Sequence, residues 1–281
     1  MQGKIVLITG ANRGIGKETA NALAKKGATI VMACRDIAKG NSVCENIKQE
    51  SGNNQIEVME LDLASLTSIR EFAKRFCQRY QQLNVLINNA GVFYMNRAET
   101  KEGFEKIMGT NYLGPFLLTN LLLPLLKQAT EARIINVVSN IYSHGQIDLC
   151  DLHQQKKYQG YKAYASSKLA IVLFTQELAE RLKGTGITVN ALHPGHAATS
   201  IWNIWPGKWY QAFLSKIIKW FLISPEEGAE TSVYLASSDE VKGVTGKYFD
   251  KKKPKDVSSK CKDLQLQKGL WQLSEKLTGL A

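Results

Sequence analysis

Near-continuous apolar runs alternate with amphipathic stretches along most of the chain. Such runs are typical of parallel strands that are buried on both faces, and the stretches between them are typical of helices packed on a sheet. Because strands that alternate with helices pair in parallel through right-handed crossovers, the pattern predicts an α/β fold with a doubly wound parallel sheet. The expected strands are Lys4–Ile8, Thr29–Cys34, Gln55–Glu60, Val85–Asn88, Arg133–Ser139 and Thr188–His193, and the expected helices are Gly14–Lys26, Ile37–Glu50, Leu66–Tyr80, Thr110–Lys127 and Ala163–Leu182.

The last third of the chain is less regular. An irregular insertion at about 197–224 precedes a final helix and a short strand near Val244–Phe249. The tail at about 251–281 is rich in lysine, and we expect it to be a solvated surface segment. The chain has no repeat of fixed period and no low-complexity linker, so we expect residues 1–281 to form a single domain.

The composition is that of a folded globular protein, with 44% apolar and 22% charged residues. The net charge of +11 favours anionic partners such as phosphates, nucleic acid or a lipid surface. The five cysteines form no C-x-x-C pair, and neither they nor the four histidines have metal-ligand spacing, so we expect reduced thiols and no metal.

We find no signal peptide and no uncharged apolar run of about 18 residues. We therefore expect a protein on the cytoplasmic side, soluble or peripherally membrane-associated; whether an anchor was removed before Met1 is left open.

A glycine-rich turn follows the first strand and leads directly into a helix. Gly10 permits a tight turn, Gly14 lets the backbone approach a pyrophosphate, and Gly16 lets the helix pack close to the sheet. The start of the helix then offers free N–H groups and the positive end of its dipole to phosphates. The turn therefore predicts a Rossmann-type dinucleotide site, whose cofactor-binding residues are Thr9, Gly10, Asn12, Arg13, Gly14, Ile15 and Gly16.

Tyr164 and Lys168 are four residues apart on a predicted helix, so their side chains project from one face. A phenol with a pKa near 10 is a poor acid–base group at neutral pH, and a nearby ammonium lowers that pKa. The pair therefore predicts a catalytic acid–base site. A pair at this spacing is also common by chance, so the prediction depends on the residues around it.

The G-x-x-x-G-x-G turn after Thr9 and the Y-x-x-x-K pair resemble the short-chain dehydrogenase/reductase family. Segments such as Met-Ala-Cys-Arg-Asp and Thr-Lys-Glu-Gly-Phe-Glu are closest to its retinol dehydrogenase branch. The resemblance implies that Tyr164 exchanges a proton with the substrate oxygen, and that Lys168 lowers the pKa of Tyr164 and bonds to the nicotinamide ribose. It also implies that Ser139 hydrogen-bonds the substrate oxygen and that Asn111 holds a water in the proton relay. Further cofactor contacts implied by matching segments are Asp62, Leu63, Asn89, Gly91 and Thr199.

The end of the second strand indicates which nicotinamide cofactor is used. NAD-binding Rossmann domains carry an acidic residue there, whereas this chain has the neutral Cys34 followed by Arg35. With Arg13 in the glycine loop, two guanidinium groups would suit a ribose 2′-phosphate, which a carboxylate would repel. We therefore predict NADP(H). The alternative is that Arg35 is an ordinary surface charge paired with Asp36.

The insertion is rich in aromatic residues with lysines between them, as in an interfacial amphipathic helix. In the family that the chain resembles, this region covers the substrate. We therefore expect a lid over a small lipophilic carbonyl or alcohol, which is retinal- or retinol-like by resemblance. We also expect peripheral membrane contact through 202–222. The alternative is a lid or core helix without membrane contact. The residues concerned are Trp202, Trp205, Trp209, Tyr210, Phe213, Trp220 and Phe221, with Lys208, Lys216 and Lys219.

Three residues that adjoin the expected pocket depart from the retinol dehydrogenase pattern: Pro115, Asn140 and His196. A carbonyl reductase for steroids, quinones or alkanals is therefore an alternative. A non-catalytic nucleotide-binding scaffold is another, because a fold does not determine a function. Nucleic-acid binding would fit the basic charge, but no recognition motif accompanies the lysines, so we expect no nucleic-acid partner. The sequence leaves a homo-oligomer open.

Overall fold

The computed structural model describes residues 1–195 and 224–280. Thr199 and the predicted membrane-contact segment at 202–222 lie outside the described residues, as does the predicted lid up to residue 223.

In the described part of the chain, eight strands form one sheet in the order β3-β2-β1-β4-β5-β6-β7-β8. Neighbouring strands from β3 to β7 are parallel, and only β8 runs antiparallel at the edge. The chain order reverses at β1, which lies between β2 and β4, and ligands of such sheets bind at the carboxyl ends of the strands beside this point. The strands are β1 (Ile5–Thr9), β2 (Thr29–Cys34), β3 (Ile56–Glu60), β4 (Val85–Asn88), β5 (Ala132–Val137), β6 (Ile187–His193), β7 (Tyr248–Asp250) and β8 (Lys253–Lys255).

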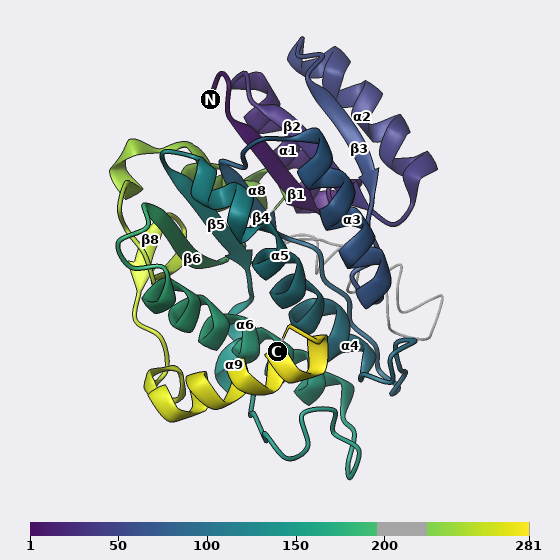
Figure 1. Ribbon diagram of the computed structural model, residues 1–281, viewed down its shortest axis with the longest axis vertical. Coiled ribbons are helices and arrows are strands. Elements are labelled where there is room, and N and C mark those ends of the chain that lie inside the picture. The colour runs from purple at the N-terminus through teal and green to yellow at the C-terminus, as the bar shows by residue number, and fades with distance from the viewer. Residues whose placement is uncertain (196–223, 281) are drawn as a thin grey trace, which may run out of the picture.

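Helices cover both faces of the sheet, which confirms the predicted α/β class (Figure 1). On one face lie α1 (Gly14–Lys25), α2 (Ile37–Ser51) and α8 (Pro225–Ser237), and on the other lie α3 (Leu66–Arg79), α5 (Gly114–Gln128) and α6 (Gly160–Arg181).

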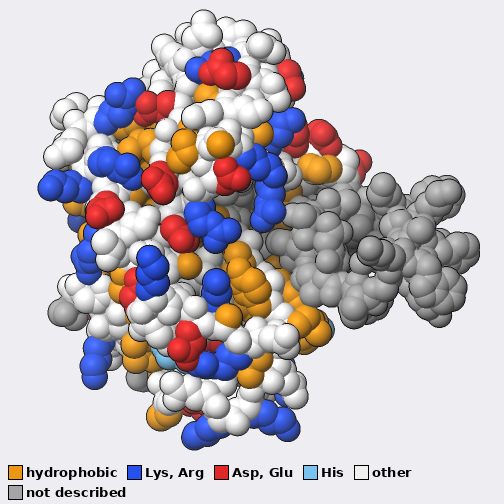
Figure 2. Space-filling model, turned by 90° about the vertical axis from the view of Figure 1, so that its right-hand side faces the viewer, with side chains coloured by type: hydrophobic (Ala, Val, Ile, Leu, Met, Phe, Trp, Pro, Cys, Tyr) orange, Lys and Arg blue, Asp and Glu red, His pale blue; other side chains and the backbone are white. Residues whose placement is uncertain are grey.

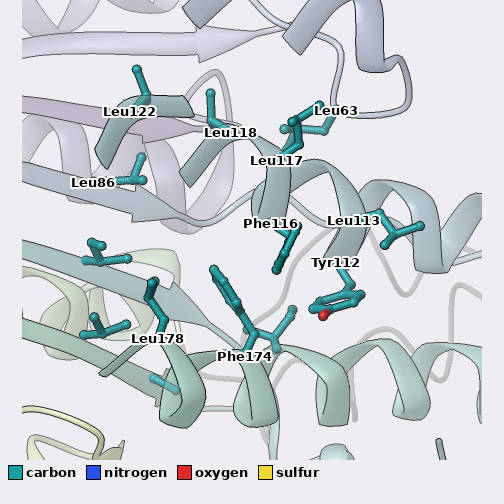
Figure 3. Packing of buried hydrophobic residues seen from close by; sticks show 14 of the residues in the cluster. Leu63, Leu86, Tyr112, Leu113, Phe116, Leu117, Leu118, Leu122, Phe174 and Leu178 are labelled. Atoms are coloured by element: carbon teal, nitrogen blue, oxygen red, sulfur yellow. The ribbon is translucent and has the colours of Figure 1, made fainter. Parts of the chain in front are cut away.

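Each face of the sheet has its own apolar core. Val6 and Ile8 of β1 belong to the core under α1, whereas Leu7 between them belongs to the opposite core, because successive side chains of a strand point to opposite faces. In the larger core, the rings of Phe116 from α5 and Phe174 from α6 pack with their centroids 5.4 Å apart (Figure 3). Both rings are almost completely buried, so α6 is held rigidly against the sheet.

The helix predicted at Thr110–Lys127 consists of three pieces. A short helix α4 (Lys106–Met108) leads into a π-helical turn at Gly109–Leu113, and α5 begins at Gly114. The N–H of Gly114 bonds to the carbonyl of Gly109, five residues back. Pro115 has no N–H to continue the regular pattern, so the carbonyl of Asn111 lacks the donor that an α-helix would supply four residues later.

The prediction that the tail is a solvated surface segment is wrong for its second half. After an exposed β8, residues 264–278 form helix α9 (Leu264–Thr278), whose Trp271 is 4% exposed. The Trp271 ring contacts Phe116 at a centroid distance of 4.9 Å, and the guanidinium of Arg181 lies 4.1 Å from the Trp271 centroid. Figure 1 shows α9, in yellow, lying across α6. The apolar residues on one face of α9 pack into the core, so this part of the tail folds as a helix although lysines surround it.

Within residues 1–195 and 224–280, we find no helix that is both long enough and apolar enough to cross a membrane.

Candidate active site

The glycine turn between β1 and α1 has the backbone geometry that its sequence predicts. Gly10 and Gly14 have φ values of 67° and 52°, in the left-handed region that favours glycine. A Cβ atom at Gly16 would lie 2.5 Å from both the Gly10 carbonyl oxygen and the Asn89 side-chain nitrogen. The start of α1 can therefore lie this close to the sheet only with glycine at position 16.

Thr9 and Asn89 fasten this turn to the end of β4. The Thr9 hydroxyl accepts hydrogen bonds from the N–H groups of Asn89 and Ala90, at 3.0 and 3.1 Å. The Asn89 side chain donates to the Thr9 carbonyl at 2.8 Å. Both side chains thus hold the walls of the site, although the sequence predicted them as cofactor contacts.

A crevice of about 660 Å³ runs along the carboxyl ends of the strands. Its size is typical of small-molecule and cofactor sites. Figure 2 looks at the right-hand side of the molecule in Figure 1, where basic and hydrophobic side chains both gather. The crevice is lined by fifteen of the predicted site residues: Thr9, Gly10, Asn12, Arg13, Gly14, Ile15, Gly16, Arg35, Asp62, Leu63, Asn89, Gly91, Ser139, Tyr164 and Lys168.

Basic side chains gather where β2 ends in this crevice. Arg13, Arg35 and Lys39 all line it, beside the neutral Cys34. The carboxylate of Asp36 accepts the N–H of Lys39 as the N-cap of α2. Among the described residues, no carboxylate forms an ion pair with Arg13 or Arg35. The alternative, in which Arg35 is paired with Asp36, is therefore wrong for the described residues.

Helix α6 carries Tyr164 and Lys168 to the same crevice on successive turns. The Lys168 Nζ atom lies 5.5 Å from the centre of the Tyr164 ring and donates to the Val137 carbonyl at the end of β5, at 3.3 Å. Lys168 is only 3% exposed. In the described part of the chain, the Tyr164 hydroxyl makes no hydrogen bond to protein, so it can bond to a ligand.

Burial dominates the pKa of both groups. It raises the pKa of Tyr164 to about 12 and lowers that of Lys168 to about 8, because desolvation penalises the charged form of each. The sequence predicted that Lys168 would lower the pKa of Tyr164. In the structure, desolvation of the phenol by burial acts in the opposite direction and raises the pKa.

Ser139 lies just beyond β5, also in the crevice. Its hydroxyl is partly exposed, and within the described residues it makes only long contacts, at 3.5 Å, to Asn140 and to the N–H of Ile141. A substrate oxygen could displace contacts this weak at little cost.

Asn111 does not line the crevice but lies directly behind it, fully buried in the π-helical turn. Its side chain accepts the N–H of Val92 at 2.7 Å and donates to the Val92 carbonyl at 3.0 Å. It also donates to the hydroxyl of Ser167, at 3.1 Å. The amide of Asn111 is therefore used to hold Val92, which itself lines the crevice.

Ser167 is a residue that the sequence reasoning missed. Its fully buried hydroxyl accepts from Asn111 and donates to the Tyr164 carbonyl at 2.7 Å. It thus links the π-helical turn to the helical turn that carries Tyr164. Its position just before Lys168 on the same helix was visible in the sequence, but its partner lies 56 residues away, so only the fold could reveal the link.

The comparisons agree with this geometry. The model of the short chain dehydrogenase family matches residues 4–206. Human retinol dehydrogenase 13 is 46% identical over 282 residues, which cover 99% of this chain and 85% of the relative. An uncharacterised protein from Mycobacterium paratuberculosis has a similar structure, with a TM-score of 0.81 and 36% identity over 99% of this chain and 94% of that chain. Pseudomonas aeruginosa RhlG, solved as an active-site complex with NADP, has a TM-score of 0.71 and 27% identity over 89% of this chain and 94% of its own.

These matches confirm the resemblance to the retinol dehydrogenase branch that the sequence motifs indicated. They also support an oxidoreductase that acts on an alcohol or a carbonyl group. The fold, the glycine turn and the family model all lead to the same assignment: the chain belongs to the short chain dehydrogenase family.

Proposed function

We propose that this protein is an NADP(H)-dependent oxidoreductase that interconverts a carbonyl and an alcohol on a lipophilic substrate. The observation that carries the proposal is that Tyr164 and Lys168 line the same crevice as the glycine turn. An acid–base pair and a dinucleotide-binding turn in one crevice are what hydride exchange with an alcohol or carbonyl requires.

The residues of the crevice fit NADP(H). Arg13, the N-cap of α1, makes no side-chain cap bond, so the first N–H groups of the helix are left for a pyrophosphate. Arg13, Arg35 and Lys39 would hold the ribose 2′-phosphate, and the neighbouring carboxylate of Asp36 caps α2 by accepting the N–H of Lys39. The complex of the similar protein RhlG with NADP supports the same choice.

The bound nicotinamide would supply or accept the hydride at the carbonyl carbon. In reduction, Ser139 would donate a hydrogen bond to the substrate oxygen, and Tyr164 would give it the proton. A phenol whose pKa is raised to about 12 stays protonated at neutral pH and is ready to donate. Lys168, buried beside it, would stabilise the phenolate that forms and bind the nicotinamide ribose.

Asn111 would complete the proton relay through its backbone. Its side-chain amide is already engaged by Val92 and Ser167. Its carbonyl lacks an α-helical donor because Pro115 has no N–H. We therefore assign the predicted water-holding role of Asn111 to this carbonyl.

Two observations support a lipophilic substrate. The relative with 46% identity is named a retinol dehydrogenase, and the insertion at 197–224 is rich in aromatic residues. Peripheral contact with a lipid surface through 202–222 stays a prediction that liposome flotation would test.

The test is the oxidation of NADPH with retinal, alkanals, steroid ketones and quinones. Tyr164→Phe should lower turnover by roughly a hundredfold or more while the Kd for NADPH stays nearly unchanged. Tyr234→Phe, which removes a hydroxyl bonded only to Glu240 outside the crevice, should behave as the wild type. Full turnover by Tyr164→Phe would refute the acid–base role of Tyr164.

A further inference from the structure

Phe93 lies beside the catalytic tyrosine on a backbone that is held in place. It follows Val92, whose N–H and carbonyl are both bound by the buried side chain of Asn111. Phe93 itself is only partly buried. Because Val92 is held on both sides and lines the crevice, the backbone at Phe93 is positioned beside Tyr164.

The rings of Phe93 and Tyr164 meet almost at a right angle. Their centroids are 5.5 Å apart and their planes are inclined by 73°. Two perpendicular rings form a corner beside the phenol. A flat conjugated molecule that stacks on one ring presents its edge to the other, and aromatic systems favour both arrangements.

The surface next to this corner is apolar and exposed. Met95 and Tyr161 are 55% and 49% exposed, among the most exposed large hydrophobic side chains of the described residues. The segment that contains Met95 packs directly on the start of α6, since any side chain at Gly160 would collide with the Tyr94 carbonyl. The Tyr161 hydroxyl is 2.6 Å from the Nδ1 atom of His144, which holds Tyr161 one turn before Tyr164.

We infer that Phe93 is a specificity-determining residue, whose ring receives the conjugated part of the substrate next to the reacting carbonyl. Met95 and Tyr161 extend this apolar surface outward for the rest of the molecule. The Phe93 ring would therefore raise the kcat/KM of a carbonyl conjugated to double bonds relative to that of a saturated chain of the same length. The inference rests on the proposed function, because it places the substrate oxygen at Tyr164.

The experiment compares two aldehydes of equal chain length, trans,trans-decadienal and decanal. The ratio of their kcat/KM values with NADPH is measured for the wild type, Phe93→Leu and Phe93→Tyr. Leucine keeps an apolar side chain but removes the ring, and tyrosine keeps the ring. Taking each variant's ratio relative to the wild type cancels the different intrinsic reactivities of the two aldehydes.

We expect Phe93→Leu to lower the ratio in favour of decadienal by roughly twofold to tenfold, and Phe93→Tyr to preserve it. The Kd for NADPH and the Tm of both variants should match those of the wild type. An unchanged ratio in Phe93→Leu, or an equal loss for both aldehydes, overturns the inference while the proposed function stands. A wild-type protein that reduces neither these aldehydes nor any other carbonyl overturns the proposed function itself.

Discussion

Lys168 lies one turn after Tyr164 on α6, with its Nζ atom 5.5 Å from the centre of the Tyr164 ring. Burial favours the uncharged form of both, since it raises the pKa of the phenol and lowers that of the ammonium. Lys168 finds only one polar protein contact among the described residues, the Val137 carbonyl. Burial of the Lys168 ammonium beside Tyr164 therefore lowers the stability of the folded state.

Lys168→Met should abolish turnover and at the same time stabilise the fold. The pKa of Lys168 falls from an ordinary 10.5 to about 8, so the charged side chain destabilises the folded state by roughly 3 kcal/mol. The unfolded chain binds more protons between these two pKa values, so this penalty is complete below about pH 8 and disappears as the pH rises towards about 10.5. Thermal melts without added NADPH should show a higher Tm for Lys168→Met near pH 7 and a smaller difference near pH 10. A lower Tm at neutral pH would contradict this reading of the site.

The two directions of the reaction should respond differently to pH. A Tyr164 pKa of about 12 keeps the phenol protonated through the neutral range. Reduction needs this protonated form and the charged form of Lys168, whose pKa is about 8, so its rate should change little between about pH 5 and pH 7. Oxidation of the alcohol needs the phenolate, whose fraction rises about tenfold per pH unit below the pKa. Initial rates measured in both directions at constant ionic strength test this, and an oxidation rate that peaks near neutral pH would rule it out.

Arg35→Asp should shift the coenzyme preference towards NADH. The substitution replaces a cation in the crevice, which has no carboxylate partner among the described residues, by an anion that repels a 2′-phosphate. We expect the Kd for NADPH to rise by roughly tenfold or more, with little change for NADH. Lys26→Asp changes the net charge equally at an exposed position at the end of α1 and should leave both affinities alone. Equal losses for both coenzymes would assign Arg35 to general binding instead.

Ser167→Ala should lower kcat without weakening NADPH binding. It removes the acceptor of Asn111 and the bond to the Tyr164 carbonyl, which frees both the π-helical turn and the catalytic helix. A small misplacement of a reacting group lowers the rate roughly tenfold or more. Ser166→Ala is the matched control, because Ser166 is also buried and its hydroxyl accepts the N–H of Gln146, outside the link from Asn111 to Tyr164. Equal kcat values for the two variants would show that Ser167 has only a structural role.

Trp271→Ala should destabilise the protein by roughly 3 to 5 kcal/mol, as other deletions of buried aromatic side chains do. The indole fills the space between α5, α6 and the guanidinium of Arg181. Leu264→Ala on the same helix, at a side chain that is 63% exposed, should change stability by less than about 1 kcal/mol. Urea unfolding of both variants gives the comparison. Similar midpoints would mean that α9 does not support the core.

Much of the fold could be predicted because its signals are local. The strands read as apolar runs, and Gly10 and Gly16 stand where the backbone allows only glycine. The pairing of Tyr164 with Lys168 was visible because a spacing of four residues on a helix brings two side chains to one face. Each of these depends on neighbours in the chain and needs no knowledge of distant contacts.

What the sequence did not predict depends on distant contacts or on competing signals. The lysines of the tail hid the helical spacing of Leu266, Leu270 and Trp271, although Asp263 caps the start of α9 and Gly279 ends it. The link from Asn111 through Ser167 joins segments far apart in the chain. The pKa of Tyr164 was predicted from its neighbour alone, whereas desolvation by the whole fold determines it.

Helix α9 joins two elements that lie far from it in the sequence, α3 and α6. Its terminal carbonyls, at Thr278 and Gly279, accept hydrogen bonds from Arg70 of α3, and its Trp271 packs against the catalytic helix α6. Cleavage near residue 264 should therefore uncover the buried rings of Phe116 and Phe174 and loosen α6, and activity should be lost although Tyr164 and Lys168 stay in the chain.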